Sequence, residues 1–249
     1  MSIEGVNSFT STLLNQLYVS QNATGNIVFN GLGLYLLLGA INFGLSGRSS
    51  AQLSLFIGEN FEELHDSEIW MHSKIAKKLD NLGKILMRQL SNSYFALFCS
   101  CDLNTLYEKV SRMLFNLDKI QVDFSNPTTS AREINAWMFQ KYTSRRKSFH
   151  ESMIRDNMMI FIHIIFFHAD LTTKFDPSRT NHQIFFDEKG EPVVVRMMNQ
   201  ECIDGVYTSP DNEYRILFQR LTQPFLFSAI VLPSAGHSIG DVIKNFKVF

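Results

Sequence analysis

Residues 158–176, MMIFIHIIFFHADLTTKFD, are the stretch that decides how this chain folds. Residues 158–167 are apolar or aromatic except for His163. A more polar segment follows and ends at Phe175, Asp176 and Pro177. A run of this length is too short to cross a bilayer, which takes about 20 apolar residues. Its richness in Ile and Phe, followed by a turn signal, predicts a central β-strand buried on both faces.

The composition indicates a globular chain with a large apolar core. Of its 249 residues, 45% are hydrophobic and 22 are Phe, which argues against a disordered chain. The 23 basic and 24 acidic residues give a formal net charge of -1, so binding to nucleic acid or to an anionic membrane is not expected. The sequence holds no repeats and no linker-like segment, and a single α+β domain over residues 1–249 is the simplest organisation.

The spacing of apolar residues predicts the other elements. An amphipathic first helix carries Phe9, Leu13 and Leu17, and residues 32–43 are apolar almost all round, which is typical of a buried helix. Further helices are expected at 73–82, at 103–117, and from 126 onward with an inner stripe of Ile134, Trp137, Met138 and Tyr142, and another helix starts near 238. Strands are expected at 27–29, 86–98, 120–124, 183–186, 193–198, 214–221 and 225–232, and residues 59–69 resemble a loop.

The cysteines and the N-terminus indicate in which cellular compartment the chain is found. Cys99, Cys101 and Cys202 are too few and too oddly spaced for a disulfide framework, so we expect buried free thiols. The N-terminus carries neither a basic segment nor an apolar core, so it is not a secretory signal. We therefore expect a cytoplasmic chain or one exported without a classical signal, and the Asn22 sequon matters only on the secretory route.

No pattern for catalysis, a cofactor or a metal ion emerges from the sequence, so the chain is not expected to be an enzyme. Gly31 and Gly33 open a helix as in a dinucleotide-binding loop, but Leu36 stands at the third glycine position and helix packing explains both glycines better. His163 and His168 point in different directions on either a strand or a helix, so they are not expected to share a metal ion. Residues 145–147, Arg-Arg-Lys, complement a helix C-terminus, with an anion site for a heparin-like ligand as the alternative.

Several motifs occur in an order and spacing that resemble one family, the serpins. They are NIVF at 26–29, GLSGRSSAQL at 44–53, INAW at 134–137, FDP at 175–177, VRMM at 195–198 and FSAIVLP at 227–233. The resemblance runs from Phe9 to about Phe246. It implies an α+β fold in which helices pack on a large, mostly antiparallel sheet beside a second sheet, incomplete at the C-terminus.

The chain departs from the serpin pattern where that resemblance implies that the sheet opens. The sequence FNGLG at 29–33 replaces a Phe-Ser-Pro-x-Ser pattern, so Asn30 and Gly33 stand where serines are usual. His163 replaces an asparagine on the long strand. At the top of that strand His168 and Leu171 fall in a segment that usually reads Lys-Gly-x-Trp, and the tryptophan is lost. These five residues form the sheet-opening region that the resemblance implies.

The resemblance implies a serine-type endopeptidase inhibitor, found in the extracellular space as family members are. Such an inhibitor presents a reactive loop as bait, and after cleavage the loop joins the sheet as a new strand and distorts the attached serine or cysteine protease. In the family pattern the loop lies beyond Phe249, so we expect this chain, as it stands, to be truncated and unable to inhibit in this way. The alternative is a non-inhibitory binding or structural fragment that associates, with itself or with another chain, through open sheet edges.

Overall fold

A computed structural model describes residues 4–22, 26–89, 92–141, 149–155, 159–187, 189–201 and 205–245. The chain divides into two compact units. Unit one comprises Met1–Thr10 and Val28–Phe167, and unit two comprises Ser11–Ile27 and His168–Phe249. Helix α1 (Glu4–Ser20) contributes its first residues to unit one and the remainder to unit two.

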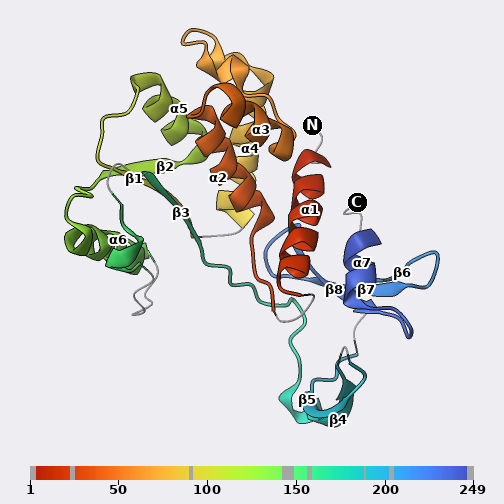
Figure 1. The fold of residues 1–249 in the computed structure, drawn as a ribbon. Helices are drawn as coiled ribbons and strands as arrows, with labels where there is room; N and C mark the ends of the chain where they lie inside the picture. The colour runs from red at the N-terminus through yellow and green to blue at the C-terminus, as the bar shows by residue number, and fades with distance from the viewer. Residues whose placement is uncertain are drawn as a thin grey trace. The chain divides into compact units, whose positions relative to one another are not determined.

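Unit one combines helices with a three-stranded sheet (Figure 1). In chain order its further elements are α2 (Gly31–Phe43), α3 (Gly47–Ile57), the 3-10 turns η1 (Glu62–His65) and η2 (Trp70–His72), α4 (Lys74–Gln89), β1 (Ser93–Cys99), α5 (Thr105–Phe115), β2 (Leu117–Gln121), α6 (Pro127–Lys141), η3 (Glu151–Met153) and β3 (Met159–Ile165). The strand order is β2-β1-β3. Strand β1 runs parallel to β2 across the helix α5 crossover and antiparallel to β3, with Phe95 opposite His163.

Helices cover both faces of this sheet, as Figure 1 shows for α2 and α6. Because side chains alternate along a strand, Ile160 and Ile162 of β3 face α6, whereas Phe161 and His163 face α2. The cluster on the α6 side is apolar: Ala96, Phe98, Val122, Phe124, Ala131, Ile134, Ile154, Ile160 and Ile162. Helix α2 lies largely buried on the other side, as its apolar sequence predicts.

Local signals explain where several helices begin and end. Asn30 caps helix α2 through its side-chain oxygen, and Asn104 caps α5 in the same way. Helix α3 ends at Gly58, whose φ of 75° is the left-handed conformation that glycine adopts without steric cost. Proline at the first position of α6 agrees with the predicted helix start.

Unit two contains two small antiparallel sheets. A hairpin pairs β4 (Asn181–Phe186) with β5 (Pro192–Met197), and a second sheet has the order β6 (Gly205–Thr208), β7 (Tyr214–Arg220) and β8 (Phe227–Pro233). The 3-10 turn η4 (Pro177–Arg179) precedes β4. Helix α7 (Ile239–Asn245) packs Val242 against Tyr214 and Ile216, so one face of the second sheet is covered.

The structure corrects several predicted elements. Residues 26–30 form no strand, and the side chain of Val28 is 96% exposed. The predicted strand at 86–98 begins only at Ser93, because helix α4 continues to Gln89, and the strand predicted at 120–124 lies at Leu117–Gln121. The predicted loop at 59–69 contains η1. Tyr142 of the predicted inner stripe lies outside the described residues.

The decisive strand is present as β3, but its environment differs from the prediction. Ile160 and Ile162 are buried, whereas Phe161, His163 and Ile165 on the other face are half-buried. Burial on both faces was therefore wrong, because the face of β3 toward α2 is only partly covered. The strand also lies at the edge, and not at the centre, of the sheet that the described residues form. Within the described part of the chain, no helix is both long and apolar enough to cross a membrane.

Candidate functional site

Three predicted site residues, Asn30, Gly33 and His163, come together where β3 packs on the N-terminus of α2. We call this place the β3–α2 contact, and it also includes Ser93 and Phe95 of β1. The side chain of His163 leaves β3 on the face that packs against α2. Its position follows from the alternation of side chains along β3, which turns the neighbouring Ile162 toward α6.

His163 is held by a hydrogen bond and by ring stacking. Its Nε2 lies 2.8 Å from Ser93 Oγ, which joins β3 to β1 through side chains. Its ring stacks on Phe95, with centroids 4.3 Å apart and planes inclined by 10°. Phe95 and His163 are also direct cross-strand neighbours. The sheet register therefore fixes the ring in one orientation.

Gly33 provides the space that the imidazole occupies. A Cβ at this position would lie 2.0 Å from His163 Cε1 and 2.7 Å from His163 Nδ1, which is too close for a real side chain. Gly33 also donates its backbone N–H to Asn30 Oδ1 at 2.5 Å, which satisfies one of the first amides of helix α2. A Cβ at Gly31 would similarly lie 2.2 Å from Thr10 Oγ1. The two glycines thus permit close packing, as the helix-packing interpretation predicts.

The surroundings of His163 favour the neutral imidazole. Burial lowers the pKa of His163 to about 4, because removing the cation from water costs more than removing the neutral ring. The N-terminus of helix α2 carries a partial positive charge, which disfavours a second positive charge beside it. At neutral pH the ring is therefore uncharged and can offer one donor and one acceptor.

His168 and Leu171, the other predicted site residues, belong to unit two. His168 is exposed, and its backbone carbonyl accepts a hydrogen bond from Gln223 Nε2 at 3.1 Å. Leu171 forms an isolated antiparallel bridge with Leu221, beside the hydrogen bond from Thr172 N to Arg220 O at 2.9 Å. Both residues therefore lie where the chain passes the end of β7.

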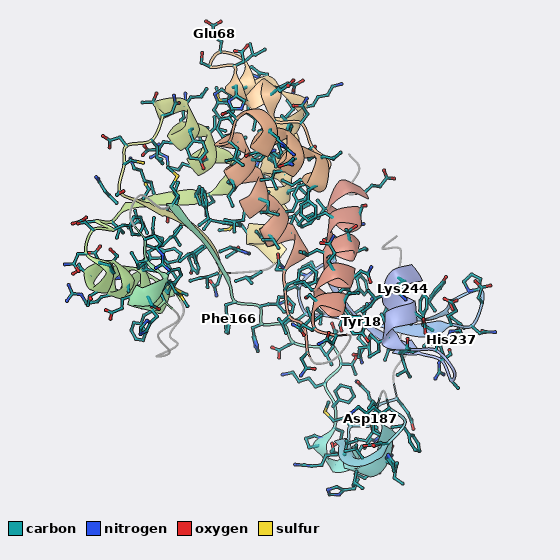
Figure 2. The ribbon with its side chains drawn as sticks, viewed as in Figure 1. Tyr18, Glu68, Phe166, Asp187, His237 and Lys244 are labelled. Carbon is teal, nitrogen blue, oxygen red and sulfur yellow. The ribbon has the colours of Figure 1, made fainter. Side chains whose placement is uncertain are left out.

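Sequence reasoning missed Ser93 and Phe95. Neither residue belongs to a motif, and they become partners of His163 only through the register between β1 and β3. Just beyond the strand, Phe166 donates its backbone N–H to Asn92 O at 3.0 Å, and Figure 2 labels Phe166 at this point. The period-two pattern of β3 could have indicated the face of His163, but not its partners.

At its other end, β3 borders a cavity of about 570 Å³. Met159 and Phe161 line the cavity together with the end of α2 and the start of α5. Phe43 and Tyr107 stack in its wall, with ring centroids 5.5 Å apart. The Tyr107 hydroxyl donates to Ala40 O at 3.1 Å, so this wall is well ordered by contacts within unit one.

The cysteines and basic residues were also candidates. Cys99 is a buried free thiol, as predicted, but Cys101 is free and exposed, because the chain leaves β1 after Cys99. Cys202 and the basic residues 145–147 lie outside the described residues. Within the part of the chain that the structure describes, no group of three or more His, Cys, Asp or Glu side chains could hold a metal ion.

Sequence comparisons identify relatives of the chain. A family model described as Serpin (serine protease inhibitor) matches residues 4–248. Mouse (Mus musculus) Serpin A12 is 26% identical over 199 residues, which are 79% of this chain and 47% of that protein. Mouse Protein Z-dependent protease inhibitor is 23% identical over 239 residues, which are 95% of this chain and 51% of that protein. The chain therefore spans about half the length of the curated relatives it matches.

Solved structures have the same fold. Manduca sexta serine protease inhibitor (serpin)-12 superposes with a TM-score of 0.82 at 16% identity, over 97% of this chain and 66% of that one. Native protease nexin-1, solved with heparin, gives a TM-score of 0.79 at 18% identity, over 98% of this chain and 67% of that one. At such identities the likeness shows the fold, and it confirms the predicted α+β class.

Proposed function

The chain belongs to the serpin family, and we propose that it supplies the sheet that receives the reactive loop in an inhibitor of serine-type endopeptidases. The match over residues 4–248 supports this proposal, as does the relative named Protein Z-dependent protease inhibitor. We likewise propose an extracellular location, as the resemblance to the family implies.

The position of β3 is the observation that carries the proposal. Among the described residues, β3 pairs with β1 on one side and has no strand on its other side. An extended peptide can add to such an edge through main-chain hydrogen bonds. Inhibition by loop insertion requires a strand with a free edge that is also held firmly in the fold. Strand β3 is held by its apolar contacts with α6.

Incubation with a panel of serine and cysteine proteases tests the proposal. We would use the product isolated from its source cells and, separately, the 249-residue chain. The expected result for an inhibitor is an SDS-stable covalent adduct that forms with an active protease and not with the same protease lacking its nucleophile. Cleavage without any adduct, by every protease and for both preparations, would refute inhibition through an acyl-enzyme.

We place the sheet-opening role on Asn30, Gly33, His163, His168 and Leu171, in accordance with the resemblance. The close packing of Gly33 against His163 supports this assignment for the first three residues. Leu171→Trp, which introduces the residue usual in the family, should change the ratio of adduct to cleaved chain. An unchanged ratio would argue against a role for Leu171.

A second candidate is a non-inhibitory protein that binds through its open sheet edges, including to a second copy of itself. The exposed apolar side chains of the β4–β5 hairpin favour this candidate, since Ile184, Phe186 and Val194 are 62%, 64% and 69% exposed. An isolated two-stranded hairpin is marginally stable in water, and exposed apolar strands promote association. Sedimentation at increasing protein concentration should reveal oligomers, whereas a monomer at all concentrations would rule out self-association.

A further inference from the structure

We propose that His163 is a pH-sensitive contact, which holds strand β3 against helix α2 when its imidazole is neutral and releases the strand when the imidazole is protonated. The inference rests on the packing of unit one and does not depend on protease inhibition. It concerns the β3–α2 contact defined above, in which Gly33, Ser93 and Phe95 surround the ring.

The imidazole of His163 fits closely between its neighbours. The imidazole occupies the space beside Gly33 that a Cβ would fill, and its face lies on Phe95. Ser93 Oγ is within hydrogen-bonding distance of Nε2. A neutral ring can use this site fully because stacking, close packing and one hydrogen bond satisfy it. Although the ring is half-buried, water cannot reach its edge beside Gly33 or its face on Phe95 unless the ring moves.

Among the described residues, the β3–α2 contact contains no counter-charge for His163. Ser93 and Phe95 on β1, and Asn30 and Gly33 on α2, are the residues described there, and none of them carries a charge. An imidazolium in this place would therefore lack the ion pair that normally makes a buried charge tolerable.

Charged side chains do occur on the neighbouring helices, but they have other partners. Helix α4 contributes Asp80 and Lys84 to the cavity beside Phe95, and these two side chains form an ion pair with each other. Helix α6 covers the opposite face of the sheet, where Lys141 lies 4.9 Å from the ring centroid of Tyr94. Tyr35 is the titratable residue of α2, and its hydroxyl donates to Glu59.

Protonation also changes the pattern of hydrogen-bond donors around His163. Both ring nitrogens of a protonated histidine are donors. Ser93 can accept from Nε2 in either protonation state, because a hydroxyl can donate or accept. Nδ1, however, lies toward Gly33 in the first turn of α2, where backbone N–H groups are also donors and the helix dipole is positive. Protonation therefore places an N–H donor and a positive charge at Nδ1 beside other N–H donors and the positive end of the helix dipole.

Release is the expected response because β3 lies at the edge of the sheet that the described residues form. Strands at the edge of a sheet open locally at a lower free energy than central strands. The lowered pKa of His163, about 4 against an ordinary 6.5, means that opening is favoured increasingly as the pH falls between these values. For full exposure of the ring, the opening equilibrium of β3 should rise roughly 70-fold between pH 7.5 and pH 4.5.

The first test is an NMR titration of the full chain labelled with ¹³C at histidine Cε1. The His163 signal is identified by its loss in His163→Asn. We expect its midpoint to lie well below 6.5, near pH 4. A midpoint near 6.5 would overturn the proposal, because the ring would then not be held in the buried site.

The second test is hydrogen exchange measured by mass spectrometry at pH 7.5 and pH 4.5, with intrinsic exchange rates corrected for pH. Peptides covering β3 should lose protection by more than tenfold in the wild type and by less than twofold in His163→Asn. Peptides covering β7 serve as an internal control and should respond alike in both proteins. Equal loss of protection at β3 in both proteins would overturn the proposal.

A further experiment applies if His163→Asn does not fold. His163→Gln is then the replacement, and the wild type by itself still decides, since β3 must lose more protection than β7. Equal losses at β3 and β7 in the wild type would show global unfolding instead of release of one strand, and would likewise overturn the proposal.

Discussion

The side-chain amide of Asn135 pairs with the backbone of Phe149 through two hydrogen bonds. Asn135 Oδ1 accepts from the Phe149 N–H at 3.0 Å, and Nδ2 donates to the Phe149 carbonyl at 2.8 Å. The side-chain amide thus bonds to Phe149 as the backbone of a neighbouring strand would. The two hydrogen bonds connect helix α6 to the segment that leads toward β3. Phe149 packs against the same apolar cluster as Ile134, so the pair also closes that cluster.

We expect Asn135→Ala to destabilise the protein by about 1–3 kcal/mol, because it leaves the N–H and the carbonyl of Phe149 without these partners. Urea unfolding followed by circular dichroism measures the loss. Gln140→Ala is the matched control, since Gln140 is an exposed residue of the same helix and should change stability by less than about 0.5 kcal/mol. Equal effects of the two substitutions would show that the Asn135 pair does not stabilise the fold.

The buried Tyr35 and the half-buried Tyr107 allow a comparison of hydrogen bonds to charged and neutral acceptors. The Tyr35 hydroxyl donates to the Glu59 carboxylate at 2.5 Å, whereas that of Tyr107 donates to the Ala40 carbonyl at 3.1 Å. Glu59 also pairs with Lys78. We expect Tyr35→Phe to cost about 1.5–3 kcal/mol and Tyr107→Phe about 0.5–1.5 kcal/mol. Thermal unfolding of both variants checks the order, and the reverse order would contradict this prediction.

Stability should depend on pH through His163. The pKa of His163 is lowered from 6.5 to about 4 by burial, so its contribution is fully present above pH 6.5. As the pH falls from 6.5 to about 4, the unfolded chain binds a proton that the folded chain does not, and stability is lost. The loss reaches about 3 kcal/mol.

Urea unfolding at pH 7.5 and at pH 4.5 measures this loss, and other ionisable groups contribute equally in the wild type and in His163→Asn. The difference between the two proteins therefore isolates the histidine. The prediction fails when His163→Asn loses as much stability on acidification as the wild type does.

Gly33 and His163 should be coupled energetically. A Cβ at position 33 would lie 2.0 Å from His163 Cε1, so Gly33→Ala should cost about 1–3 kcal/mol through overpacking. In a His163→Ala background, Gly33→Ala should destabilise the protein far less, because the imidazole with which its Cβ would clash is absent. A double-mutant cycle measured by urea unfolding gives the coupling, and additive effects would contradict a direct contact.

The thiols should differ in reactivity. Cys101 is exposed, whereas Cys99 is buried, and burial raises the pKa of the Cys99 thiol and so keeps it in the unreactive protonated form. Brief treatment of the native protein with iodoacetamide at pH 7.5, followed by peptide mapping, should label Cys101 and spare Cys99. Treatment in urea, which exposes both thiols, is the control. Equal labelling in the native state would contradict the described burial of β1.

Elements with a strong local pattern could be predicted from the sequence. The apolar residues of α2 form a largely buried helix, and the run rich in Ile and Phe forms strand β3, although only one face of that strand is buried. The ordered motifs likewise predicted the family, which the match over residues 4–248 shows.

Predictions failed where a short apolar run was ambiguous. The stretch from residue 86 was expected to be a strand, but Leu79, Leu82 and Leu86 are all buried along helix α4. That spacing of three and four residues matches a helix, and the contacts of α4 with α2 and α5 keep the last turn helical. A short apolar run cannot by itself distinguish a buried strand from the end of a buried helix.

The sequence by itself determined that a strand carrying His163 would pack an apolar face, and that glycines would open the buried helix. Only the tertiary structure decided that Gly33, Ser93 and Phe95 surround the same imidazole. Gly33, and Ser93 with Phe95, are far from His163 along the chain. The register of β1 with β3 brings Ser93 and Phe95 to the imidazole, and the packing of α2 on β3 brings Gly33. Because side chains alternate along a strand, a shift of one residue would turn His163 toward α6 and abolish the contact. Pairing between distant strands therefore decides this site, and local sequence cannot specify it.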